Sequence, residues 1–192
     1  ADIIFAAYGF NESFAGTDGL GEFKAKLTEF VQAAKAKGFN GKRGPQLVLL
    51  SPIASENITG VDAAKNNKNI RLYTLAMSEV AKAQQVGFIN VFDATIKAMR
   101  PTGIDLTFNG CHLNDAGYRL FSRLVFDAAF DKPAPVFNEE IRSAVLEKNK
   151  QFFRRFRPVN TFYYTGGRNR SYGYLDFLPA MRNFDIMTAN RD

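Results

Sequence analysis

Residues 3–13 read Ile3-Ile4-Phe5-Ala6-Ala7-Tyr8-Gly9-Phe10-Asn11-Glu12-Ser13. A short apolar run that ends in glycine and polar residues is typical of a buried strand, so we expect a strand over residues 3–7 that delivers Asn11 at its carboxyl end. A second run, over residues 46–51, is ended by Pro52, and a third covers residues 88–93. We predict that these three runs form the strands of the fold.

Helical patterns lie between and after the three runs. Apolar residues recur at helical spacing over residues 23–38 and 69–85, and again after Asn114, which is a good N-cap. Strands that alternate with helices imply parallel pairing with right-handed crossovers, so the fold class is α/β. The residues expected on the inner side of the second helix are Ile70, Leu72, Leu75, Ala76 and Val80.

The last third of the chain differs in composition. Pro133 and Pro135 close the α/β pattern, so we predict a first domain over residues 1–135 and a C-terminal extension over residues 136–192, helical and then irregular. A helix begins near Asn138 and carries a basic end. Aromatic and basic residues together are compatible with nucleic-acid binding, but we favour packing against the first domain, with the arginine heads in water. The residues expected to pack in this way are Phe152, Phe153, Phe156 and Phe162.

Composition excludes several classes of protein. The 192 residues are 46% hydrophobic with a formal net charge of +6, which argues against disorder of the whole chain. The single Cys111 excludes an internal disulfide and leaves cytoplasm and periplasm both open. One histidine and one cysteine argue against a metal site, and we expect no cofactor. No apolar segment approaches the ~20 residues of a membrane span, so we expect a soluble domain.

The only histidine lies in the run Asn109-Gly110-Cys111-His112-Leu113-Asn114. An imidazole transfers protons near neutral pH, and the side-chain amide of Asn11 can donate to an oxyanion. Ligands collect at the carboxyl ends of parallel strands, where both residues are expected. We therefore predict that Asn11 and His112 share one crevice, although 101 residues separate them in sequence.

The block Gly9-Phe10-Asn11-Glu12 resembles the Gly-x-Asn-Asp/Glu block of the SGNH, or GDSL-type, hydrolases. The run from Asn109 to His112 is similar to the closing Asp-x-x-His block of that family, and the resemblance covers about residues 2–130. It implies a three-layer α/β/α flavodoxin-like fold that hydrolyses short acyl esters or acetylated carbohydrates. By this resemblance Asn11 donates to the oxyanion, Gly9 permits a sharp turn and His112 is the general base.

The sequence departs from the family pattern in two places. The Gly-Asp-Ser block with the nucleophile and the block with the oxyanion glycine have no counterpart, so we expect a chain truncated at its N-terminus, inactive by itself and part of a larger bacterial multidomain protein. Asn109 replaces the aspartate that orients the histidine, and Asp105 is the alternative acid. In serine proteases the comparable change costs about 10⁴ in turnover.

A nucleophile within the chain is the alternative to truncation. The loop serines are Ser13, Ser51, Ser55 and Ser171. None lies in a Gly-x-Ser-x-Gly turn, and Ser51, at a strand end, is the best of them. A Cys111–His112 pair is not expected, because neighbouring side chains diverge.

The sequence supports two further hypotheses. A noncatalytic module that binds a glycan or a protein is the alternative function, and Tyr163, Tyr164, Tyr172 and Tyr174 suit a sugar. If no strand flanks residues 3–7 on one side, that edge can pair with another chain or with the missing segment.

Overall fold

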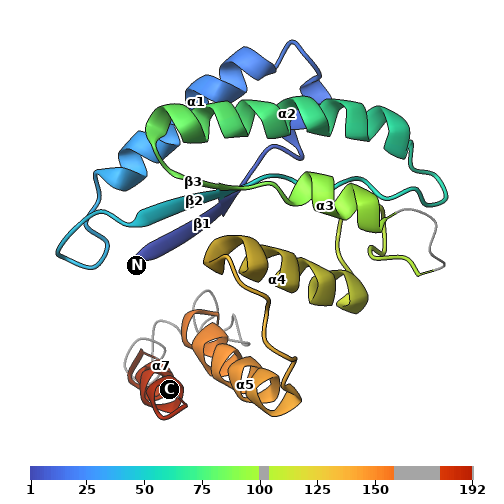
Figure 1. Cartoon of the computed structure of the whole chain (residues 1–192). Helices are drawn as coiled ribbons and strands as arrows, with labels where there is room; N and C mark the ends of the chain where they lie inside the picture. Colours follow the sequence, from blue (N-terminus) through green and yellow to red (C-terminus); the bar gives the residue numbers. More distant parts are fainter. Residues whose placement is uncertain (100–103, 158–177, 192) are drawn as a thin grey trace, which may run out of the picture. The chain divides into compact units, whose positions relative to one another are not determined.

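The computed structural model describes residues 1–99, 104–157 and 178–191 (Figure 1). The chain divides into two compact units, Ala1–Ala134 and Pro135–Asp192. The tyrosines considered for sugar binding, together with Phe162 and Ser171, lie outside the described residues.

The first unit contains a parallel sheet of three strands in the order β1-β2-β3. The strands are β1 (Ile3–Ala7), β2 (Gln46–Leu50) and β3 (Gly87–Ile89). Ile3 lies opposite Gln46 in the register, and Val48 lies opposite Gly87. The helices α1 (Leu20–Lys35) and α2 (Ala63–Gln84) form the crossovers that parallel pairing requires. The predicted α/β class with a parallel sheet is confirmed.

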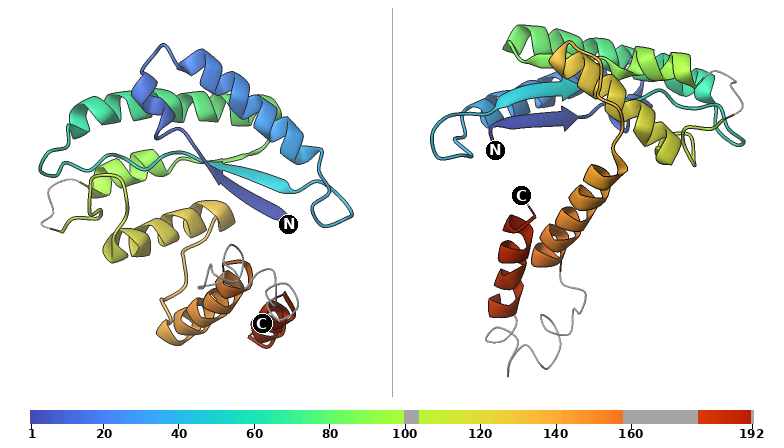
Figure 2. Two further views of the ribbon diagram at one scale, coloured as in Figure 1. Left: turned by 180° about the vertical axis from the view of Figure 1, so that it is seen from behind. Right: turned by 60° about the horizontal axis from the view of Figure 1, so that its bottom comes forward.

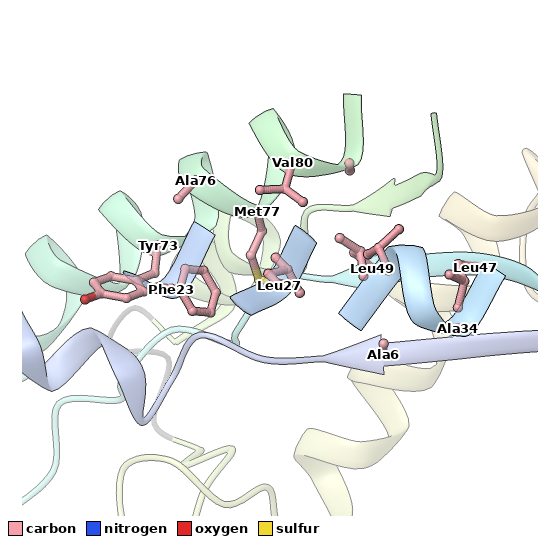
Figure 3. Packing of buried hydrophobic residues seen from close by; sticks show 12 residues of the cluster. Ala6, Phe23, Leu27, Ala34, Leu47, Leu49, Tyr73, Ala76, Met77 and Val80 are labelled. Atoms are coloured by element: carbon pink, nitrogen blue, oxygen red, sulfur yellow. The ribbon is translucent and has the colours of Figure 1, made fainter. Parts of the chain in front are cut away.

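Helices cover both faces of the sheet (Figure 2). On one face, α1 and α2 pack their apolar sides on β1 and β2, as Figure 3 shows for Phe23, Tyr73 and Met77. On the other face, Phe121 and Val125 of α4 (Asp115–Phe130) pack against Leu50 and Ile89. Four residues of α1 repeat at spacings of three and four: Phe23, Leu27, Val31 and Ala34. The structure therefore has the three layers that the resemblance implied.

Two element boundaries differ from the sequence-based expectation. Helix α2 begins at Ala63, six residues before the expected start, because the Asp62 carboxylate accepts a hydrogen bond from Lys65 N at 3.0 Å. Its inner side follows Ile70, Tyr73 and Met77, and Leu75 points outward, contrary to expectation.

Strand β3 ends at Ile89 and does not continue to residue 93. The helix α3 (Val91–Ala98) starts there, capped by Asn90, whose Oδ1 accepts from Asp93 N at 3.1 Å. This helix was not predicted, because the apolar run suits a strand as well as a helix and only the cap decides between them.

The second unit contains α5 (Glu139–Phe156) and α7 (Leu178–Ala189), which pack on each other. Asn138 caps α5, as its position in the sequence predicts, by accepting from Glu140 N and Ile141 N. Phe152, Phe153 and Phe156 are each more than half exposed, so the second unit does not bury them, and their packing against the first domain stays a prediction. Among the described residues, no helix is long and apolar enough to cross a membrane.

Candidate active site

Three segments follow the carboxyl edge of the parallel sheet. They are residues 8–19 after β1, residues 51–62 after β2, and residues 104–114 between α3 and α4. The first holds Gly9 and Asn11, and the third holds Asn109 and His112. The histidine segment is thus separated from β3 by α3, whereas the sequence predicted that it follows the third strand directly. Gly9 and Asn11 leave this edge, where parallel sheets bind ligands, whereas Asn109 and His112 follow α3.

The histidine segment is anchored by Glu56, which is only 3% exposed. The Glu56 carboxylate accepts hydrogen bonds from Leu106 N at 2.8 Å, Thr107 N at 2.7 Å and Thr107 Oγ1 at 2.5 Å. Glu56 N in turn donates to Gly110 O at 2.9 Å. Sequence reasoning missed this residue, because its partners are mainly backbone groups that no sequence pattern announces.

A tight turn presents the imidazole. Thr107 and Leu113 form an isolated antiparallel bridge, and Phe108 N donates to His112 O at 3.0 Å. Gly110 has φ +86°, and a Cβ there would lie 3.0 Å from Val61 Cγ2, so glycine is required at this point of the turn. The Phe108 ring stacks on the His112 ring with centroids 5.6 Å apart.

Asn109 holds His112 on one side. Its Oδ1 accepts from His112 N at 2.9 Å, and His112 Nδ1 lies 2.9 Å from Asn109 Nδ2 and 3.1 Å from Oδ1. The predicted pairing of these two residues is therefore present in the structure, with a neutral amide where the family places a carboxylate. Nε2 makes no hydrogen bond within the described residues, so it remains open to a reacting group. Asp105 makes no contact with His112 there and does not replace the acid; its backbone oxygen accepts from Asn114 Nδ2.

Cys111 lies closer to His112 than expected. Its Sγ is 3.2 Å from His112 Nδ1 and 3.4 Å from Asn109 Oδ1, so the expectation that the two neighbouring side chains diverge is wrong. The turn curls both side chains toward the Asn109 amide. Burial raises the pKa of the Cys111 thiol, which favours the protonated form over the nucleophilic thiolate. The contact therefore adds no activated nucleophile.

The asparagine half of the site is built on a turn after β1. Gly9 has φ +96°, and a Cβ there would lie 3.2 Å from Pro52 Cγ and 3.3 Å from Met77 Sδ, which explains the glycine. Gly9 N donates to Glu12 Oε2 at 2.9 Å. Phe10 packs beside the buried Phe92, so the segment is fixed on both sides of Asn11.

Asn11 itself is exposed, and its carboxamide makes no hydrogen bond within the part of the chain that the structure describes. An amide in this state is available to a bound group. No hydrogen bond in the described ranges joins Asn11 or Gly9 to His112 or Asn109. Their convergence on one substrate stays a prediction.

The three loop serines that the structure describes are not placed to act as the nucleophile. Ser13, Ser51 and Ser55 are buried, and their hydroxyl groups are engaged away from His112. Ser51 Oγ, for example, accepts from Phe92 N at 3.0 Å and donates to Pro52 O at 3.1 Å. Ser51 therefore has a structural role at the start of α3.

A cavity of about 330 Å³ lies beside β1, lined by aromatic residues that include Tyr8, Phe30 and Tyr73. Neither His112 nor Asn109 lines it, so we do not assign the ester to it. In residues 1–99, 104–157 and 178–191, no three histidine, cysteine or acidic side chains cluster closely enough to hold a metal ion.

Comparison with known proteins gives a family and a fold. The sequence model of the GDSL-like lipase/acylhydrolase family matches residues 1–120. Two mutants of Axe2, an acetyl-xylooligosaccharide or acetylxylan esterase from Geobacillus stearothermophilus, each superpose with a TM-score of 0.52 at 16% identity. The match covers 67% of this chain and 59% of theirs, so the chain spans well under two thirds of these esterases.

A lipase/acylhydrolase from Enterococcus faecalis matches with a TM-score of 0.49 at 17% identity, over 70% of this chain and 65% of that one. No curated protein matches by sequence. At 16% identity the two Axe2 matches establish the fold alone.

Proposed function

The chain belongs to the GDSL-like lipase/acylhydrolase family, and from this premise we propose that its first unit takes part in serine ester hydrolysis with His112 as the general base. One observation carries the proposal. Asn109 occupies the Nδ1 side of the imidazole, and Nε2 makes no hydrogen bond within the described residues. This is the orientation that a proton-transferring histidine needs.

The proposed reaction uses His112 and Asn11 in sequence. His112 Nε2 takes the proton of a serine hydroxyl while the serine oxygen bonds to the ester carbon, and the carbonyl electron pair moves to the oxygen. The Asn11 amide donates to this oxyanion, a contribution of typically ~3–4 kcal/mol to the barrier. As the carbonyl re-forms, the alcohol leaves with the proton from His112. Water then repeats the steps on the acyl-serine and releases the acid.

The serine of this scheme is proposed to come from a segment outside residues 1–192. Strand β1 pairs only with β2 in the described sheet, and Ile3 and Phe5 are 52% and 47% exposed. An edge strand with free backbone groups and apolar side chains accepts a further strand. In the flavodoxin-like strand order 2-1-3-4-5, β1, β2 and β3 would correspond to strands 3, 4 and 5. Strand 1 of that order then lies on the open side of β1. We propose that a strand there, from this protein or another chain, brings the nucleophile.

Short acyl esters and acetylated carbohydrates are the proposed substrates. The support is the fold shared with an esterase whose own substrate is an acetylated xylo-oligosaccharide. The exposed Phe108 ring, stacked on His112, offers an apolar face on which a sugar ring can lie.

The test combines fluorophosphonate labelling with hydrolysis of nitrophenyl acetate. The chain of residues 1–192 is expected to show neither labelling nor turnover above the His112→Ala variant, because the hydroxyl groups of its described loop serines are engaged elsewhere. Adding in trans a peptide with a strand and a Gly-Asp-Ser turn is expected to restore labelling, and His112→Ala to abolish it. If the chain alone shows turnover that vanishes in His112→Ala, the claim that the nucleophile lies outside residues 1–192 is contradicted. If peptide-supported labelling survives His112→Ala, the role of His112 as the base is contradicted.

A noncatalytic binding module is the second candidate. It is favoured by the neutral Asn109 beside the imidazole, since an amide supplies no charge to stabilise an imidazolium. Calorimetric binding of acetylated xylo-oligosaccharides, together with absence of labelling even with the peptide present, would select this function over hydrolysis.

A further inference from the structure

Helix α5 packs on α7 through its polar side. Arg155 Nε lies 2.9 Å from both carboxylate oxygens of Asp185, and Arg191 forms a longer ion pair with Glu147, at 3.7 Å. Gln151, on the same side of α5, is buried. This packing is the reverse of the usual one, in which an amphipathic helix buries its apolar stripe. The apolar side of α5 is consequently left without a partner among the described residues of the second unit.

That side forms a continuous apolar arc. At about 100° per residue, Ile141, Val145, Phe152 and Phe156 fall within about 60° of one another, and Leu146 and Phe153 extend the arc to about 140°. These six residues, which we call the α5 apolar face, are each about half exposed or more. The rings of Phe152 and Phe156 are 5.0 Å apart. Arg142, paired with Glu139, and Asn149 interrupt the arc.

Basic residues border the α5 apolar face on both sides. At the same helical spacing, Lys148 and Arg155 lie along one border, and Lys150 and Arg157 lie along the other. The Arg155 guanidinium lies 5.2 Å from the centre of the Phe156 ring, and that of Arg157 lies 5.0 Å from the centre of the Phe153 ring. Side chains of this kind run their apolar stems along the face and place their charges at its rim.

We propose that the α5 apolar face binds the surface of an anionic lipid bilayer. A strong separation of apolar and basic sides at low overall hydrophobicity is the pattern of helices that lie in the membrane interface. The phenyl groups then enter the acyl boundary, and Lys150 and Arg157, on the border away from Asp185, meet anionic headgroups. The combination of charge and apolar surface favours an anionic bilayer over a nucleic acid. A nucleic acid would match the basic side chains but would leave six apolar side chains in water.

The experiment uses the absence of tryptophan from the chain. Phe152→Trp places a single fluorophore in the α5 apolar face. Addition of vesicles of phosphatidylcholine with about 30% phosphatidylserine is expected to shift its emission to the blue, with binding about tenfold weaker to phosphatidylcholine alone. Phe130→Trp in α4 is the matched control, because Phe130 is helical and 58% exposed while Phe152 is helical and 55% exposed, and no shift is expected there.

A second measurement separates apolar contact from simple charge attraction. In vesicle sedimentation the double variant Phe152→Ala/Phe156→Ala keeps every charge and is expected to bind about tenfold more weakly, whereas Phe130→Ala binds like the parent chain. Absence of a blue shift, equal binding to neutral vesicles, or full binding by the double variant overturns the proposal. A shift that appears on raising protein concentration without lipid assigns the face to a second copy and also overturns it.

Discussion

At the scale of single residues, the charge beside the imidazole decides how the site operates. Asn109 contacts His112 through both atoms of its amide and carries no charge. Asn109→Asp places a carboxylate at the same position, where it stabilises the imidazolium over the neutral ring. We expect Asn109→Asp, supplemented with the Gly-Asp-Ser peptide, to hydrolyse nitrophenyl acetate faster than the supplemented parent, by up to about 10⁴-fold.

The rate of nitrophenol release measures this directly. Asn114→Asp is a control with the same charge change in the cap of α4. A rate in Asn109→Asp that equals the parent's, or that of the control, would show that a charge beside the imidazole does not assist the base.

Glu56 carries the second prediction at this scale. Glu56→Gln replaces one accepting oxygen by an NH₂ group that faces the donors of Leu106 and Thr107. A buried NH₂ group that faces N–H donors has no acceptor, which costs ~1–3 kcal/mol. We therefore expect the free energy of unfolding to fall by about 2 kcal/mol. Urea denaturation measures the loss, and hydrogen exchange at residues 106–107 is expected to accelerate.

Glu29→Gln is the matched control, because Glu29 is exposed on α1. Its unfolding free energy is expected to stay close to that of the parent. If Glu56→Gln unfolds at the parent's urea concentration, the carboxylate is not the anchor of the histidine segment.

At the scale of helices and strands, side-chain caps determine helix starts that the hydrophobic pattern does not predict. Asn90 ends β3 and starts α3, so Asn90→Ala is expected to lose about 1 kcal/mol of stability, and Asn90→Ser to recover most of it. Urea denaturation of the three chains tests this order. Equal stability of the alanine and serine variants would mean that packing of Phe92, and not the cap, starts the helix.

The same elements show how much of the fold and the site the sequence predicts. Periodicity predicted the three strands, α1 and most of α4, and the caps Asn114 and Asn138 were identified because a polar residue precedes a helical pattern. α3 was missed because residues 88–92 satisfy both periods. The Asn109–His112 contact followed from a family spacing, whereas Glu56 was missed because a carboxylate that binds backbone N–H groups leaves no pattern in the sequence.

At the scale of the whole molecule, each unit exposes apolar surface that a self-sufficient domain normally covers. In the first unit this surface is β1, whose neighbour on one side is β2 and whose residues Ile3 and Phe5 are about half exposed. In the second unit it is the α5 apolar face. Sequence patterns could not foresee either, because a pattern marks a side chain as apolar without stating whether a partner covers it.

The open edge of β1 predicts self-association of the isolated chain. With no charge between Asp2 and Glu12, nothing in this strand opposes edge-to-edge pairing with a second copy. We expect the elution volume in gel filtration to fall as concentration rises, and Phe5→Lys to restore a monomer, since a charge on an edge strand blocks pairing. Phe14→Lys, at a residue that is 65% exposed but outside the strand, is expected to associate like the parent. A parent chain that stays monomeric at every concentration would show that the β1 edge is already covered, and would remove the support for a strand that brings the nucleophile there.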